Sequence, residues 1–191
     1  MTGLTAGSPE LAAKNLQIFK EALPRLSRVG LLVDVSNLNY DPLRREVETA
    51  AQTLGMRLIP RVEVSRPEAL AGAFATMTRE RAMAVFVIGG TMLYANRTRL
   101  GELATTNHLP TMCGPQPFVA AGCLMGYSAD ISDMFRRSAI YVDKILKGAK
   151  PADLPIEQPT KFQLVINLRT AKSLGVTIEP SVLARADQVI D

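Results

Sequence analysis

The chain contains 191 residues, of which 47% are hydrophobic and 21% are charged, so it is long enough to bury a sizeable core and too apolar to be disordered as a whole. Its formal net charge is +4, but the basic residues occur in scattered pairs beside acidic ones, and aromatic residues make up only 5%. This distribution argues against a nucleic-acid-binding surface, and no apolar stretch approaches the roughly 20 residues that a membrane-spanning helix needs.

Helices and strands are predicted to alternate over the first part of the chain. Leu11, Ile18 and Phe19 recur at helical spacing after a cap at Ser8, which predicts a helix over about 9–22. The elements expected after it are strand 29–34, helix 41–54, strand 57–64, helix 69–79, strand 82–88, helix 92–106 and strand 111–113. Because short apolar strands that alternate with helices form parallel sheets, we expect an α/β fold with a doubly wound, Rossmann-like sheet.

The pattern changes after Cys113. A turn into a short helix or extended stretch is expected over 115–119, a strand over 122–127, and a helix from a cap at Asp130 to Gly148. A proline-rich connection over 150–159, a strand over 162–167 and two short helices over 170–174 and 180–190 complete the chain. Residues 129–191 therefore have no obvious sheet of their own, and we expect them to pack on a second sheet that is mostly absent from this chain.

Two features bear on the cellular compartment. Cys113 and Cys123 match no zinc-binding spacing, and buried free thiols are the favoured interpretation, although pairing in an oxidising compartment stays open because a sequence carries no geometry. The amino terminus, residues 1–4, has neither the basic nor the apolar region of a secretion signal. The chain as written is therefore expected to be cytoplasmic.

Polar and small residues follow three of the predicted strands. Because ligands bind beyond the carboxyl ends of parallel strands, these loops form the candidate site for a small polar ligand. The residues are Asp34, Ser36, Asn37, Asn39 and Tyr40 in the first loop, Gly89, Gly90, Thr91 and Met92 in the second, and Gly114, Gln116 and Phe118 in the third. Turn and cap roles explain the same residue types equally well.

Catalysis and cofactor binding find little support in the motifs. Gly89 and Gly90 lack the spacing of both common phosphate-binding signatures, and the only histidine, His108, lies in a turn that leads into a strand, at the opposite end of the sheet. No nucleophile elbow and no metalloprotease helix is present. We therefore expect neither an enzyme nor a bound cofactor or metal ion.

Several segments resemble a known family. These are SPELAAK over 8–14, RVGLL over 28–32, YVDKILKGAKPADLPIEQPTKF over 141–162 and VINLRTAK over 165–172. They are similar to the ABC transporter substrate-binding family that includes tryptophan- and tyrosine-type binding proteins. The resemblance implies a type I periplasmic binding protein fold, in which two α/β lobes close on a ligand, and this chain resembles only its later portion. Residues 7–127 would form the second lobe, and residues 128–191 the hinge and a segment that returns to the first lobe.

The resemblance also implies which residues line the ligand site. The wall contributed by the second lobe would contain Asn37, Asn39, Gly90, Thr91, Met92, Gly114 and Gln116, with Tyr127 and Ser128 at the hinge. Many relatives carry an Asp-Asn pair where this chain has Gly90 and Thr91, so a carboxylate that could meet a ligand ammonium group is missing here.

The expected function follows from this resemblance. The chain would be the solute-binding component of an ABC importer and would bind a small organic solute such as an amino acid or a related compound. It would be located in the periplasm, like the family, and its partner would be a membrane permease. The alternative is a cytoplasmic ligand-sensing or interaction module with the same core. An apolar stripe over 135–146 further predicts a dimer or a swapped assembly, because it would otherwise remain exposed.

Overall fold

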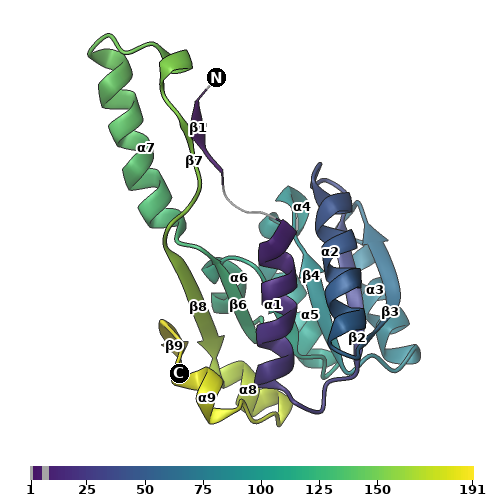
Figure 1. Cartoon of the computed structure of the whole chain (residues 1–191). Coiled ribbons are helices and arrows are strands. Elements are labelled where there is room, and N and C mark those ends of the chain that lie inside the picture. The colour runs from purple at the N-terminus through teal and green to yellow at the C-terminus, as the bar shows by residue number, and fades with distance from the viewer. Residues whose placement is uncertain (1, 6–8) are drawn as a thin grey trace.

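A computed structural model describes residues 2–5 and 9–191, and its main body is one seven-stranded sheet (Figure 1). The strand order is β3-β2-β4-β5-β6-β8-β9, and all neighbouring strands run parallel except β6 and β8. The strands of this sheet are β2 (Arg28–Asp34), β3 (Arg57–Val64), β4 (Ala84–Ile88), β5 (Thr111–Cys113), β6 (Met125–Ala129), β8 (Phe162–Asn167) and β9 (Gln188–Ile190). The expected doubly wound α/β fold is confirmed.

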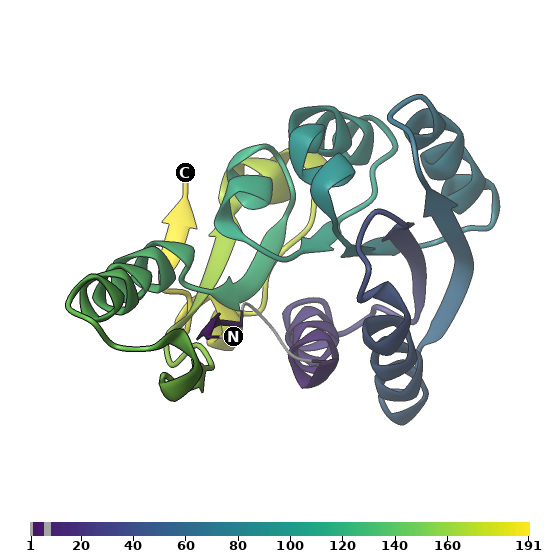
Figure 2. The same ribbon diagram turned by 90° about the horizontal axis from the view of Figure 1, so that it is seen from above.

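Helices cover both faces of this sheet (Figure 2). One face carries α1 (Pro9–Ala22), α2 (Tyr40–Thr53), α8 (Leu168–Leu174) and α9 (Pro180–Leu183), and the other carries α3 (Ala69–Arg79), α4 (Thr91–Ala95), α5 (Arg97–Thr106) and α6 (Gln116–Ala120). The sequence of β2 is continuously apolar because both faces of the strand are buried. Leu31 and Val33 pack into the core on one face of the sheet, and Leu32 packs into the core on the other. A strand buried on both faces leaves no position for a polar residue except its ends.

Two predicted helices differ from those observed. The helix expected over 92–106 is interrupted at Asn96, whose backbone leaves helical geometry and whose side-chain amide donates to the carbonyl of Met92 at 2.8 Å. Such local bonds compete with the helical pattern. The helix expected over 180–190 is wrong beyond Leu183, because residues 188–190 form β9 and pair with β8.

The carboxyl-terminal segment also differs from expectation. Strand β8 pairs antiparallel with β6, from Met125 opposite Ile166 to Ala129 opposite Phe162, and β9 follows at the edge of the same sheet. Residues 162–190 therefore belong to the main body, and the expected return of the whole segment 128–191 to another lobe is wrong for them. The physical reason is that strand pairing is a long-range contact, which local sequence does not encode.

The rest of that segment, together with β1 near the amino terminus, forms an arm that stands away from the sheet (Figure 1). The arm contains β1 (Gly3–Leu4), α7 (Ile131–Leu146), the short 3-10 helix η1 (Pro151–Asp153) and β7 (Ile156–Glu157), and β1 pairs parallel with β7. Tyr141 on α7 donates to the carbonyl of Pro155 at 3.0 Å, which ties the helix to the segment before β7. Asp130 caps α7 as predicted, whereas the cap predicted at Ser8 lies outside the described residues.

The arm leaves much of α7 exposed. Phe135 and Leu146, at the two ends of the predicted apolar stripe, are 74% and 81% exposed. No helix in residues 2–5 and 9–191 is long and apolar enough to cross a membrane.

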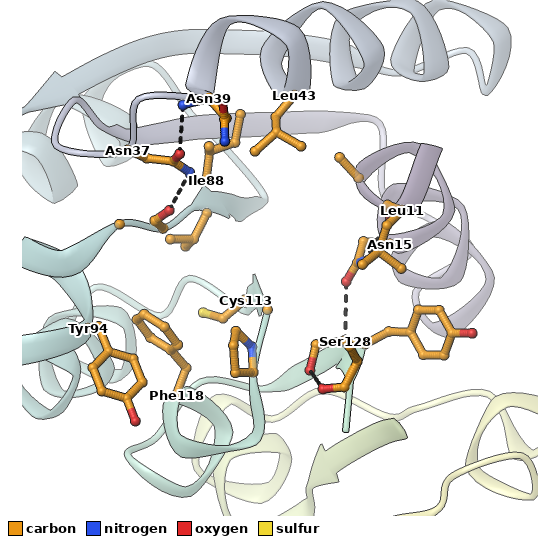
Figure 3. Close-up of a pocket in the computed structure, with 18 of the residues that line it drawn as sticks. Leu11, Asn15, Asn37, Asn39, Leu43, Ile88, Tyr94, Cys113, Phe118 and Ser128 are labelled. Carbon is orange, nitrogen blue, oxygen red and sulfur yellow. Dashed lines mark hydrogen bonds between the residues drawn. The ribbon is translucent and has the colours of Figure 1, made fainter. Parts of the chain in front are cut away.

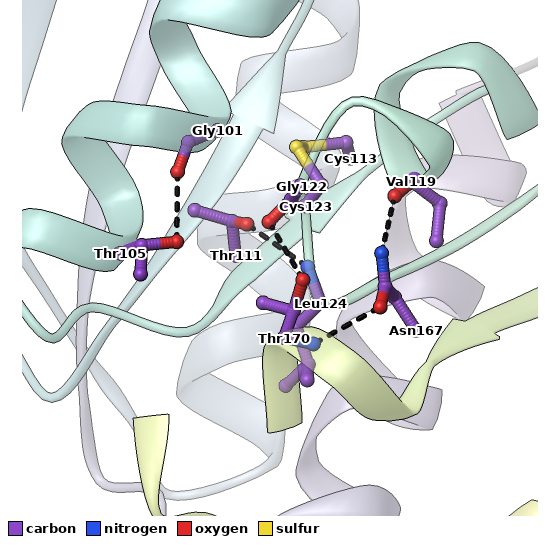
Figure 4. Close-up of a disulfide and its surroundings, with 10 residues drawn as sticks. All are labelled: Gly101, Thr105, Thr111, Cys113, Val119, Gly122, Cys123, Leu124, Asn167 and Thr170. Atoms are coloured by element: carbon purple, nitrogen blue, oxygen red, sulfur yellow. Dashed lines mark hydrogen bonds between the residues drawn. A yellow bond between two sulfur atoms is a disulfide. The ribbon is translucent and has the colours of Figure 1, made fainter. Parts of the chain in front are cut away.

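A disulfide joins Cys113 to Cys123, so the expectation of free buried thiols is wrong (Figure 4). The two residues flank α6, and their Cα atoms lie 6.5 Å apart. Side chains of β8 and α8 hold the same segment in place. The side-chain amide of Asn167 donates to the carbonyl of Val119 at 2.9 Å, and the hydroxyl of Thr170 donates to the carbonyl of Gly122 at 3.2 Å. The loop after β5 is therefore fixed at both ends.

Candidate ligand-binding site

A cavity of about 880 Å³ lies at the carboxyl ends of the parallel strands (Figure 3). Its walls come from the loops after β2, β4 and β5, the first turns of α1, the end of β6 and the first residue of α7. Loops converge at this edge of a parallel sheet because each strand enters its following helix there. The cavity thus lies where the sequence predicted a ligand site.

A buried carboxylate joins the first two loops. Asp34, at the end of β2, accepts hydrogen bonds from the backbone N–H of Ser36 at 2.9 Å and from that of Leu93 at 2.8 Å. Gly90 passes so close that a Cβ atom there would lie 2.8 Å from the Asp34 Oδ2. The loop after β4 therefore packs directly onto the end of β2, and glycine is required at this point of closest approach.

The two predicted asparagines of the first loop have different surroundings. Asn37 uses its side chain inside the protein, since Nδ2 donates to the carbonyl of Gly89 at 2.8 Å and Oδ1 accepts from the N–H of Asn39 at 3.0 Å. The side chain of Asn39 is exposed and makes no hydrogen bond within the described part of the chain. Asn37 thus positions the loop, and Asn39 presents an amide with free donors and acceptors.

The opposite wall joins α1 to the end of β6. Asn15 is almost fully buried, and its Nδ2 donates to the carbonyl of Leu11 at 2.8 Å while its Oδ1 accepts from the N–H of Tyr127 at 3.3 Å. The ring of Tyr127 stacks on Phe162 of β8 with centroids 5.6 Å apart. This wall is therefore held by contacts between three elements that are distant in sequence.

An aromatic pair lines a third side. The rings of Tyr94 and Phe118 meet edge to face, with centroids 5.7 Å apart, and both lie at the cavity (Figure 3). The guanidinium of Arg97 lies 5.1 Å from the Tyr94 ring centroid and donates to the Tyr94 carbonyl at 3.0 Å. Phe118 belongs to α6, which the disulfide brackets. We name Tyr94 and Phe118 the aromatic shelf.

The structure brings most of the predicted site residues together. The cavity is lined by Asn37, Asn39, Gly90, Thr91, Gly114, Tyr127 and Ser128. Met92 and Gln116 are not among the lining residues. Met92 packs against the core beneath α3 and α5, and Gln116 is the first residue of α6.

Sequence reasoning missed several other lining residues. Leu11, Asn15, Leu43, Ile88 and Tyr94 carry apolar or helical patterns that equally indicate core positions. Leu11, Leu43 and Ile88 lie near the amino end of a helix or the carboxyl end of a strand, the ends that meet at this edge of the sheet, whereas Asn15 and Tyr94 carry no such signal in the sequence.

The titratable groups with shifted pKa values are Arg137, Tyr141 and Glu157 in the arm and Arg44 on α2, and none of them lines the cavity. The pKa of Glu157 is lowered, first because Arg137 donates a hydrogen bond to its carboxylate. Burial raises the pKa of Tyr141. Among residues 2–5 and 9–191, no three His, Cys, Asp or Glu side chains gather in a way that would hold a metal ion. The described lining of the cavity offers apolar side chains and neutral hydrogen-bonding groups.

The sequence model of a family described as ABC transporter substrate binding protein matches residues 1–190. This chain belongs to that family. Its α/β fold and its mostly parallel sheet are those of periplasmic binding protein-like relatives. No match was found among curated proteins.

Solved structures show how much of such a substrate-binding protein is present here. A conserved domain protein from Vibrio cholerae aligns with a TM-score of 0.88 at 23% identity, over 98% of this chain and 62% of its own. An ABC domain from Streptococcus pneumoniae in complex with L-Trp aligns with a TM-score of 0.85 at 26% identity, over 94% and 60%. A ligand-free, open substrate-binding protein from Clostridium difficile aligns with a TM-score of 0.71 at 16% identity, over 100% and 62%. The chain therefore spans about three fifths of the length of these relatives.

Proposed function

We propose that this chain binds a small organic solute in the cavity at the carboxyl ends of β2, β4 and β5, without changing it chemically. The observation that carries the proposal is that cavity, which is built from converging loops in a substrate-binding family member. The pneumococcal structure, solved with L-Trp, supports an amino acid or a related compound as the starting class of solute.

We further propose that the chain acts as the solute-binding component of an ABC importer, with a membrane permease as its partner. In a two-lobed protein of this family the cavity would face a second lobe across an interlobe cleft, and the arm of this chain would belong to that lobe. The disulfide between Cys113 and Cys123 supports an oxidising compartment such as the periplasm, because disulfides persist there and are rare in the cytosol.

The test is native mass spectrometry of the purified chain, which reports a retained solute directly. A cavity-filling variant is Gly114→Phe, since Gly114 lines the cavity and an added Cβ meets no atom within 4 Å. The matched control is Gly72→Phe on α3, where an added Cβ also meets no atom within 4 Å and which lies outside the cavity. We expect the wild-type chain and Gly72→Phe to retain the same solute and Gly114→Phe to lose it.

Equal retention by Gly114→Phe would place the solute elsewhere and contradict the proposal. The exposed apolar face of α7 favours one other candidate, a ligand-sensing or interaction module that uses this surface to contact a protein. That candidate would be supported instead if the chain retained no solute and if no small solute raised its melting temperature.

A further inference from the structure

The cavity combines a ring-binding side with neutral polar groups. The aromatic shelf and the aliphatic side chains of Leu11, Leu43 and Ile88 supply the apolar wall (Figure 3). Asn39 and Thr91 supply an amide and a hydroxyl that make no side-chain hydrogen bond within the described part of the chain. A flat ring with one hydrogen-bonding edge complements such a surface.

Two charged side chains beside this wall, those of Asp34 and Arg97, are occupied by other contacts. Asp34 is fully buried, and its two carboxylate oxygens accept from the backbone N–H groups of Ser36 and Leu93. Arg97 stacks on the Tyr94 ring and donates to the Tyr94 carbonyl. All described lining residues are themselves uncharged. An ammonium or carboxylate group that left water for this wall would therefore meet no opposite charge, and its lost hydration would oppose binding.

We propose that this wall selects a neutral aromatic solute, whose ring lies on the aromatic shelf and whose polar edge faces Asn39 and Thr91. The proposal rests on solute binding at this cavity and replaces the amino-acid starting class of the proposed function with neutral aromatic compounds. It separates the solute from amino acids, which carry both an ammonium and a carboxylate group. Tyr94 is the specificity-determining residue, because it is 45% exposed at the cavity, whereas Phe118, whose ring it meets edge to face, is buried.

The test compares indoles that share one ring and differ in charge. The probes are 3-methylindole, which is neutral, tryptamine, a cation, indole-3-propionate, an anion, and L-tryptophan, a zwitterion. Because the chain contains no tryptophan, the indole fluorescence of each probe, excited where tyrosine does not absorb, reports its binding to the wild-type protein. We expect 3-methylindole to bind about tenfold more tightly than each charged probe, since only it keeps its hydration cost small.

Variants of Tyr94 test the shelf itself. Tyr94→Phe keeps the ring, and we expect the affinity for 3-methylindole to stay within about threefold of wild type, whereas Tyr94→Ala should lower it about tenfold. The half-exposed position of Tyr94 allows both variants to fold, which circular dichroism verifies.

Each outcome decides the proposal. A charged probe that binds as tightly as 3-methylindole, or a Tyr94→Ala variant that binds 3-methylindole like wild type, overturns it. If 3-methylindole does not bind while Gly114→Phe still removes another solute in native mass spectrometry, the neutral aromatic class is wrong and solute binding stands. If 3-methylindole binds Gly114→Phe and wild type equally, the ring does not occupy the cavity, and the proposed function fails together with this inference.

Discussion

Individual residues at the cavity edge show how the same residue type serves different purposes. Asn37 and Asn39 are two positions apart, yet Asn37 bonds to Gly89 and to the Asn39 backbone, whereas the Asn39 side chain is exposed. The sequence indicates that both lie in a loop after a strand. Which amide is consumed inside the protein depends on the position of the neighbouring loop, which is 52 residues away in sequence.

Gly90 is the residue at which close approach matters most. We expect Gly90→Ala to lower the free energy of unfolding by about 1–3 kcal/mol, because the new methyl group would meet the buried Asp34 carboxylate and the Ser36 hydroxyl, each 2.8 Å away. The control is Gly72→Ala on the exposed side of α3, where no atom lies within 4 Å, and it should raise stability by about 0.5–1 kcal/mol. Urea unfolding measures both changes, and effects of equal sign would contradict this account.

Among the secondary-structure elements, those whose pattern is local were predicted well. Helix α3 and strands β3, β5 and β8 lie at their predicted residues, because their apolar spacing and their flanking turn residues agree. The segment 180–190 was mispredicted because Val182, Ala186 and Val189 mimic helical spacing. Its last residues, 188–190, form β9 because they pair with the edge of β8, and Asp187 and Leu164 exchange hydrogen bonds just before this pairing.

The disulfide-bracketed element α6 gives a second prediction. The double variant Cys113→Ser with Cys123→Ser should lower the free energy of unfolding by about 2–3 kcal/mol, because it releases a loop with a sequence separation of 10. Urea unfolding of the variant with and without a reductant measures this. The wild-type chain should lose the same stability in reductant and the variant none; a variant as stable as the oxidised wild type would contradict the prediction.

Strand β7 gives a third prediction, on pH. Because the pKa of Glu157 is lowered in the folded chain, mainly by Arg137, its pairing stabilises the arm above the ordinary pKa of a glutamate and is lost as the pH falls through the lowered value. Hydrogen exchange of the β7 amides, corrected for intrinsic rates, should therefore quicken in acid. Glu157→Gln should abolish this pH dependence, and Glu68→Gln, an exposed position at the start of α3, should leave it unchanged.

For the whole molecule, the central feature is an arm attached to a complete sheet. The body buries two cores, one on each face, while the outer side of α7 stays exposed. Exposed apolar stripes of this kind are usually covered by another protein surface.

Association through α7 is therefore the fourth prediction. We propose that the wild-type chain forms a dimer at micromolar concentration, since each fully buried large apolar side chain contributes about 1.5–3 kcal/mol. Phe135→Ser and Leu146→Ser should shift sedimentation velocity profiles towards the monomer. Lys147→Ser, an exposed position at the end of the same helix, is the control and should not. A monodisperse wild-type monomer would contradict the prediction.

The sequence by itself determined the α/β class, the order of most elements and the three loops that meet at the cavity, because these depend on local periodicity and on the general geometry of parallel sheets. Only the tertiary structure decided that residues 162–190 complete the main sheet, that Cys113 and Cys123 pair, and that Tyr94 joins Phe118 at the cavity. These features rest on contacts between residues far apart in the chain or on the direction of individual side chains. Neither leaves a pattern in the neighbouring residues.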